Sequence, residues 1–122
     1  MRNKVLIVDD DLTLCELGKE MFEILNVEAA SALTLEEAVE FFNENNESIG
    51  LVIFDLNLEE VTGIEVFTEL QKIDNEFTGI LTSGVFIEED AKMYKDIGFK
   101  DIILKPYNMS NLKDLIAKYL EK

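Results

Sequence analysis

The chain has 122 residues, of which 48% are hydrophobic, so it can bury the core of one domain and is too short for two. Its formal net charge of −15, from 11 basic and 26 acidic residues, argues against binding nucleic acid or an anionic membrane surface, because both need clustered lysine or arginine. No apolar run approaches the roughly 20 residues that span a bilayer. The single cysteine, Cys15, excludes an internal disulfide and fits a reducing compartment. We therefore expect one cytoplasmic domain over residues 1–122.

Apolar runs typical of buried strands alternate with segments of helical periodicity along the whole chain. The predicted strands are residues 4–8, 27–31, 51–54, 78–82 and 101–104. The predicted helices are residues 12–25, a segment opened by a capping box of Thr34 and Glu37, a segment from about Gly63 to Ile73, and residues of about 87–97 and 109–121. In the first helix the residues that recur at helical spacing are Leu14, Leu17, Met21 and Leu25.

Five strand–helix units with short connections predict a parallel sheet covered by helices on both faces. The first, third and fourth strands are the most apolar and should lie in the centre, whereas the second and fifth carry polar residues that suit edges. We therefore predict a three-layer, doubly wound α/β fold of the flavodoxin-like type, with strand order 2-1-3-4-5 and five helices. In this order the ligand site lies between the first and third strands, at their carboxyl ends.

Acidic residues stand at the carboxyl ends of these two strands. Asp9, Asp10 and Asp11 follow the first strand, and Asp55 follows the third. Because close carboxylates repel one another, they readily share a hard divalent cation such as Mg²⁺ (or Mn²⁺). We expect Asp10 and Asp55 to bind it directly, Asp9 to bind through water, and the backbone carbonyl of Asn57 to add a ligand. One of the three N-terminal acids should also cap the first helix.

The fourth and fifth strands end in a hydroxyl group and an ammonium group. Thr82 can donate a hydrogen bond to a phosphoryl oxygen, although its β-branched side chain also suits the strand itself. Lys105, which precedes the only proline, can pair with Asp55 or with a group attached to it, although a solvated lysine in a turn also explains the pattern. Together with the acids, these residues predict a site for a divalent metal and a phosphoryl group.

These motifs resemble the receiver domain of bacterial two-component response regulators over essentially the whole chain. The residues that carry the resemblance are Asp9 and Asp10 in VLIVDDD, Asp55, Asn57 and Gly63 in LVIFDLNLEEVTG, Thr82 in ILTSG, and Lys105-Pro106 in GFKDIILKPY. Each motif is short, but all four occur in order at the expected strand ends.

The resemblance implies a signalling switch. Asp55 would accept a phosphoryl group from a phosphohistidine on a sensor histidine kinase or a histidine phosphotransfer protein, with Mg²⁺, and self-catalysed hydrolysis would reset it. Since the chain contains no histidine, another protein must supply the imidazole. Thr82 and Lys105 would contact the phosphoryl group. Output would be contact with a downstream protein, and the charge-balanced residues 88–122 are the candidate contact face, including for a weak homodimer.

Three positions depart from the family pattern. Ile102 stands where the family usually has an aromatic residue, so the coupling of that ring to Thr82 must be altered or absent, although Ile102 also suits a strand core. Glu59 stands where the family usually has proline, and its carboxylate can approach the metal or point to solvent. Gly84 should leave its loop mobile and Asp55 relatively open to water, which predicts a short-lived acyl phosphate.

Two other functions compete with this interpretation. A receiver-like binding module that is never phosphorylated is compatible with Ile102 but not favoured by the intact acids, Thr82 and Lys105. A magnesium-dependent aspartyl phosphatase would also use an aspartate at a strand end. It would need a second aspartate at position 57, where this chain has asparagine. We therefore expect no turnover enzyme.

Overall fold

The computed structural model describes residues 2–85 and 88–120, and for residues 88 and 89 it describes the backbone alone. The strands are β1 (Lys4–Val8), β2 (Ala29–Ala32), β3 (Ile49–Asp55), β4 (Thr78–Ser83) and β5 (Asp101–Leu104). The helices are α1 (Leu12–Ile24), α2 (Leu35–Asn45), α3 (Gly63–Ile73), α4 (Glu88–Ile97) and α5 (Met109–Tyr119). Position 87, the predicted start of the fourth helix, and position 121, the predicted end of the last, lie outside the described residues.

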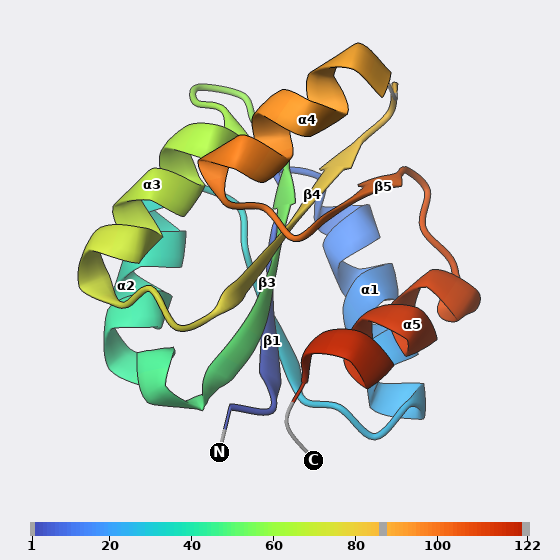
Figure 1. The fold of residues 1–122 in the computed structure, drawn as a ribbon. Helices are drawn as coiled ribbons and strands as arrows, with labels where there is room; N and C mark the ends of the chain where they lie inside the picture. The colour runs from blue at the N-terminus through green and yellow to red at the C-terminus, as the bar shows by residue number, and fades with distance from the viewer. Residues whose placement is uncertain (1, 86–87, 121–122) are drawn as a thin grey trace.

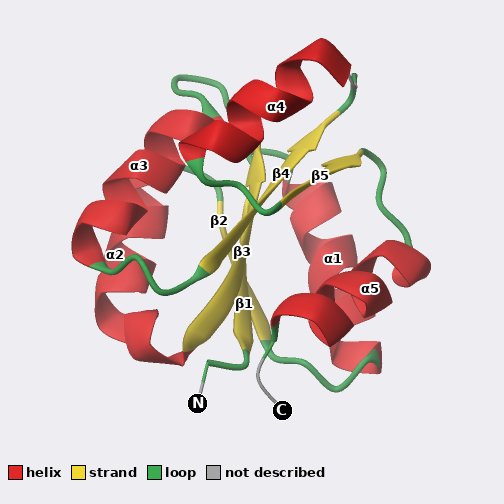
Figure 2. Cartoon of the chain, in the orientation of Figure 1, coloured by secondary structure: helices red, strands yellow, loops and turns green. Residues whose placement is uncertain are grey.

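The five strands form one parallel sheet in the order β2-β1-β3-β4-β5, which confirms the predicted topology. Helices α1 and α5 cover one face, and α2, α3 and α4 cover the other (Figures 1 and 2). Two buried clusters follow from this layering, one against α1 and α5 and one against α2 and α3. Among the described residues, no helix is both long and apolar enough to cross a membrane.

The predicted apolar face of α1 is partly wrong. Leu17 is 51% exposed, and the buried residues of this helix are instead Cys15, Gly18 and Phe22. Gly18 is buried because the side chains of Ile7 and Tyr107 lie where its Cβ would be. Glycine does not contribute to a hydrophobic pattern, so the spacing of the leucines in α1 predicted a buried face that is shifted from the observed one.

Pairing between neighbouring strands gives three of them different bounds from those predicted, and the smallest change is in β4, which ends at Ser83 rather than at residue 82. β2 begins at Ala29 rather than at residue 27, and β3 extends over Ile49–Asp55 rather than 51–54. All seven residues of β3 are buried, as expected for the central strand of a sheet covered on both faces. Asp55 is thus the last residue of the most enclosed strand, and Thr82 of β4 lies beside it in register.

At the opposite end of the sheet, Arg2 fastens three segments together. Its guanidinium donates to the Asp74 carboxylate at 2.6 Å and to the backbone carbonyls of Asn46 and Ile49 at 3.0 and 3.2 Å. The backbone of Arg2 and the side chain of Leu120 flank Gly50, which leaves no room there for a Cβ. The first and last described residues therefore lie together at the amino edge, far from the strand ends that carry Asp9 and Asp55 (Figure 1).

Candidate functional site

A buried ion network joins three strand ends at the carboxyl edge. Asp9 is 2% exposed and Asp55 is 5% exposed, so both carboxylates are largely withdrawn from water. Lys105 Nζ lies 3.0 Å from Oδ2 of Asp9 and 3.2 Å from Oδ2 of Asp55. The predicted pairing of Lys105 with Asp55 is therefore present, but the shorter contact is with Asp9. One ammonium group thus bridges the ends of β1 and β3 from the end of β5.

The three acids after β1 separate into different environments. Asp11 caps α1, because its carboxylate accepts a hydrogen bond from the Leu14 amide at 3.2 Å. One cap among the three acids was predicted, and it is Asp11. The other oxygen of Asp9 accepts from the Asp11 amide at 2.9 Å. Asp10 is exposed, and its carboxylate has an oxygen within 4.8 Å of oxygens of Asp9 and Asp55.

The cluster carries more negative than positive charge. Three carboxylates face one nearby ammonium, and their oxygens are close enough to share one small ion. Burial, and then the charge of Asp9, raise the pKa of Asp55 above its usual range, although Lys105 and the Asn57 amide act in the opposite direction. A divalent cation with oxygen ligands suits this donor set and its uncompensated charge. Asp9, Asp10 and Asp55 are the residues that would hold it.

Lys105 remains cationic in this setting. Burial alone would lower its pKa, but the hydrogen bond and charge of Asp9, followed by those of Asp55, outweigh burial and raise it. The Lys105 amide also donates to the Ser83 carbonyl at 2.8 Å, which fastens the end of β5 to β4. The peptide bond from Lys105 to Pro106 is cis.

The turn after Asp55 is held tightly against the strand end. The Asn57 amide donates to Oδ1 of Asp55 at 3.4 Å, and the Gly63 amide donates to the Leu56 carbonyl at 3.0 Å. A Cβ at Gly63 would collide with the Asp55 carbonyl oxygen, so only glycine allows this approach. Asn57 therefore lies beside the acid cluster. That its carbonyl binds metal stays a prediction.

Thr82 is buried directly beside Asp55. Its hydroxyl donates to the Phe54 carbonyl at 3.3 Å, and the residue is 1% exposed. The next residue, Ser83, shapes the β4–α4 loop, since its hydroxyl donates to the Val85 carbonyl at 2.8 Å and accepts from the Val85 amide at 3.2 Å. This local turn was not predicted from the sequence. Serine side chains often form such turns by bonding to the backbone two residues further along the chain.

Ile102 borders a hollow of about 170 Å³ that also contacts Ser83, Val85 and Tyr94. Ile102 packs against the buried cluster, as its strand position requires, and Tyr94 of α4 is the aromatic residue that faces the same hollow. Sequence reasoning did not find Tyr94. The surroundings of Gly84 are open, since a Cβ added there would meet no atom within 4 Å.

The expected openness of Asp55 is not found in this structure. Although the space at Gly84 is open, the Asp55 side chain is only 7% exposed, because Lys105 lies against it. Glu59 is exposed on the β3–α3 loop and is not one of the three clustered carboxylates in the described part of the chain. Of the two alternatives for Glu59, the structure therefore favours the solvent-facing one.

Cys15 takes no part in the chemistry of the site. Burial, and then the Asp9 charge, raise the pKa of its thiol to about 11, so it stays protonated at neutral pH. The thiol donates to the Asp9 carbonyl at 3.4 Å. Cys15 is a packing residue, as predicted, and it supports the backbone of the acidic turn.

Comparisons with known proteins bear on the family and on the fold. The family model of the response regulator receiver domain matches residues 5–117. The chain is 32% identical to the transcriptional regulatory protein CpxR homolog of Haemophilus influenzae, over 95% of this chain and 48% of that protein, so it spans about half of that relative. It is 25% identical to sporulation initiation phosphotransferase F of Bacillus subtilis, over 98% of this chain and 95% of that protein. A receiver domain protein from Clostridium thermocellum has a similar structure, with a TM-score of 0.85, 27% identity, and coverage of 93% of this chain and 90% of that one.

Proposed function

We propose, because this chain belongs to the response regulator receiver domain family, that Asp55 accepts a phosphoryl group and that residues 1–122 act as a phosphorylation-dependent switch. The observation that supports this most directly is the placement of Asp55. It is a buried carboxylate with excess negative charge around it, one ammonium against it and a threonine beside it in register. This arrangement suits a carboxylate that accepts a negatively charged phosphoryl group while a divalent cation is bound beside it.

The proposed reaction moves one phosphoryl group between two proteins. The bond from phosphorus to a histidine nitrogen of a sensor kinase or phosphotransfer protein breaks, and a bond from phosphorus to a carboxylate oxygen of Asp55 forms. Lys105 is placed to offset charge on the transferring oxygens, because its ammonium already lies 3.2 Å from Asp55. A bound Mg²⁺ or Mn²⁺ would supply further charge compensation through Asp9, Asp10, Asp55 and the Asn57 carbonyl. Hydrolysis of the acyl phosphate would restore the free carboxylate.

Thr82 is the proposed internal reporter of phosphorylation. Its hydroxyl now donates to a backbone carbonyl, a bond that it can exchange for a stronger one to an anionic phosphoryl oxygen. Because Ser83 ties the following loop to this strand end, movement of Thr82 would reposition that loop. Ile102 lacks an aromatic ring, so the response of β5 is expected to be altered.

The proposed output is protein contact through α4, β5 and α5. Met93, Ile97 and Leu104 are large apolar residues on these elements that are 49%, 37% and 50% exposed. Such exposure suits either a downstream protein or a weak homodimer. We propose that the exchange takes place in the cytoplasm, the reducing compartment that suits the free, buried Cys15.

The test is phosphorylation by a small donor. Wild-type protein incubated with acetyl phosphate and Mg²⁺ should gain one phosphoryl group by intact-mass spectrometry, and Asp55→Asn should gain none. Asp74→Asn is the matched control, because it removes a partly buried, ion-paired carboxylate at the other end of the sheet and should leave the phosphoryl gain unchanged. An unmodified wild type would favour the binding module that is never phosphorylated, and continuous phosphate release from many substrates would favour a phosphatase.

A further inference from the structure

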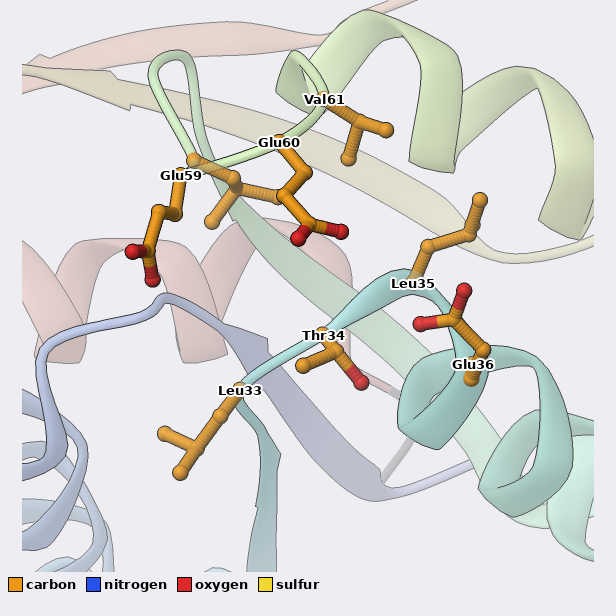
Figure 3. A pocket seen from close by; sticks show the side chains of 8 residues that line it. Leu33, Thr34, Leu35, Glu36, Glu59, Glu60 and Val61 are labelled. Atoms are coloured by element: carbon orange, nitrogen blue, oxygen red, sulfur yellow. The ribbon is translucent and has the colours of Figure 1, made fainter.

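A groove lies between two segments that take no part in the proposed phosphoryl chemistry. Residues 33–36, where β2 leads into α2, form one side, and residues 58–61 of the β3–α3 loop form the other. The groove has a volume of about 130 Å³. Figure 3 shows the two segments facing each other, with Leu35 directed toward the loop and the carboxylates of Glu36 and Glu60 directed toward the space between them.

The walls of the groove are apolar and firmly supported. Leu35, Leu58 and Val61 are half-buried and pack against the core cluster beneath α2 and α3. A cavity of about 150 Å³ accepts one benzene-sized group, so this groove has room for one apolar side chain. The backbone on both sides is also fixed, since the Leu33 amide donates to the Glu37 carboxylate at 2.8 Å and the Leu58 amide to the Val61 carbonyl at 3.1 Å.

The rim of the groove carries three uncompensated charges. Glu36, Glu59 and Glu60 are exposed, and within residues 2–85 and 88–120 none of them has an ion-pair partner. Glu16 is paired with Lys19 at 3.1 Å and Glu69 with Lys72 at 2.6 Å, but Glu20 and Glu23, among the described residues, are also exposed without an ion pair. The groove differs from those sites because its three unpaired carboxylates border apolar walls. An apolar groove ringed by free carboxylates therefore favours an apolar group with positive charge on both sides of it.

Charge also disfavours the simplest other occupants. A second copy of this chain would bring a net charge of −15 toward the same acidic rim, and an anionic lipid surface would be repelled in the same way. We propose that this groove binds a segment of a partner protein in which one apolar side chain is flanked by lysine or arginine. The apolar side chain enters between residues 33–36 and 58–61, and the flanking cations meet Glu36, Glu59 and Glu60.

The binding test uses the whole chain without phosphorylation, so its failure would leave the proposed function of Asp55 untouched. Amide shifts of ¹⁵N-labelled protein are followed while the capped pentapeptide Lys-Arg-Leu-Arg-Lys is added. Shifts should centre on residues 33–36 and 58–61. The same peptide with serine in place of leucine should bind at least about fivefold more weakly, because it loses the buried apolar side chain. Salt should weaken both peptides by screening.

Matched variants separate the groove from general attraction to an acidic protein. The triple variant Glu36→Gln, Glu59→Gln, Glu60→Gln should bind the leucine peptide about tenfold more weakly, as expected for three exposed charge pairs. The control triple variant Glu20→Gln, Glu23→Gln, Glu47→Gln removes three charges from equally exposed residues away from the groove, and it should lose less than about threefold. Both should keep the wild-type amide spectrum elsewhere.

Four results would overturn the proposal. These are equal weakening in the two triple variants, equal binding of the serine and leucine peptides, shifts centred away from the groove, or no saturable shifts at about 2 mM peptide. Shifts of the groove residues with protein concentration alone would assign this face to a second copy instead.

Discussion

Each end of the sheet holds a largely buried cation against carboxylates, and the two ends use this arrangement differently. At the amino end, Arg2 lies 2.6 Å from Asp74. At the carboxyl end, Lys105 lies 3.0 Å from Asp9 and 3.2 Å from Asp55. The side chains of Arg2 and Lys105 are similarly enclosed, at 15% and 17% exposure. The geometry of an ion pair alone therefore does not distinguish structural from functional charge.

The difference lies in the balance of buried charge: Asp9 and Asp55 are both buried beside Lys105, whereas the second acid near Arg2, Glu76, is exposed. The hydrogen bond from Arg2 lowers the pKa of Asp74, so the folded state favours its charged form. Burial, and then Asp9, raise the pKa of Asp55, so the folded state disfavours its charged form. At the amino end Arg2 pairs with Asp74 and, at 3.5 Å, with the exposed Glu76, and this ion pairing supports the fold. The carboxyl end holds repulsion between buried carboxylates that a bound cation can relieve, which supports its proposed role as the functional end.

Magnesium should produce the largest contrast between the ends. A ligand that binds only the folded state at about 100 times its dissociation constant adds about 2.7 kcal/mol to the free energy of unfolding. Saturating Mg²⁺ should therefore stabilise wild type and Asp74→Asn by similar amounts, and Asp55→Asn by much less, in urea unfolding monitored by circular dichroism. An equal gain in Asp55→Asn would place the ion away from this acid cluster.

Glycine substitution should show that the space around Gly50 at the amino end is filled and that the space around Gly84 in the β4–α4 loop is open. A Cβ at Gly50 would meet the Arg2 carbonyl and lie 3.0 Å from the Leu120 side chain, so Gly50→Ala should lower the free energy of unfolding by about 2 kcal/mol. Gly84 has open surroundings and lacks a positive φ, so Gly84→Ala should change it by less than about 0.5 kcal/mol. If Gly50→Ala and Gly84→Ala lowered the free energy of unfolding equally in urea, the proposed difference in packing between the two positions would be wrong.

Removing one carboxyl charge from each end should change stability in opposite directions when no metal is present. Asp74→Asn should lower the free energy of unfolding at pH 7 by about 1 to 2 kcal/mol, because it breaks a charged hydrogen bond. Asp55→Asn should raise it by up to about 1 kcal/mol, because it removes repulsion from Asp9. Destabilisation by Asp55→Asn in metal-free buffer would show that its pair with Lys105 outweighs that repulsion.

The pH dependence of these two variants follows from the signs of the pKa shifts. A lowered folded-state pKa at Asp74 gives stability that is present above the unfolded value of about 3.9 and is lost as pH falls through the folded value. The loss in Asp74→Asn should therefore shrink in strong acid. A raised folded-state pKa at Asp55 reduces stability at higher pH, and this reduction disappears as pH falls from the folded value to the unfolded one. The gain in Asp55→Asn should shrink over that window.

The sequence predicted the sheet order and the residues that meet at its carboxyl edge, because these depend on apolar runs and on the residue that ends each run. Helix caps were equally accessible. Thr34 caps α2 by accepting from the Glu37 amide at 3.1 Å. The return bond of the predicted capping box differs, since the Glu37 carboxylate accepts from Leu33 rather than from Thr34. Local signals were therefore sufficient for this cap, although they did not reveal the buried Gly18 face of α1 or the Ser83 turn.

Contacts between distant segments could not be predicted in the same way. Arg2 and Asp74 are 72 positions apart, and nothing in either local segment indicates the other. The sequence placed Lys105 and Asp9 in one site, but their direct ion pair depends on where β1 and β5 end relative to each other along the strand direction. The groove beside Glu59 likewise arises from two loops that only the folded chain brings together.

The meeting of Arg2 and Leu120 around Gly50 has a practical consequence for handling the molecule. Both described ends of the chain lie at the amino edge of the sheet, and β3 runs from that edge to Asp55 over seven residues, or about 23 Å at 3.3 Å per residue. A biosensor surface, a resin or a fluorescent fusion joined at either end would therefore be tethered on the side opposite the acids. Immobilised protein should remain as accessible to a phosphodonor as protein in free solution, whichever end carries the tether.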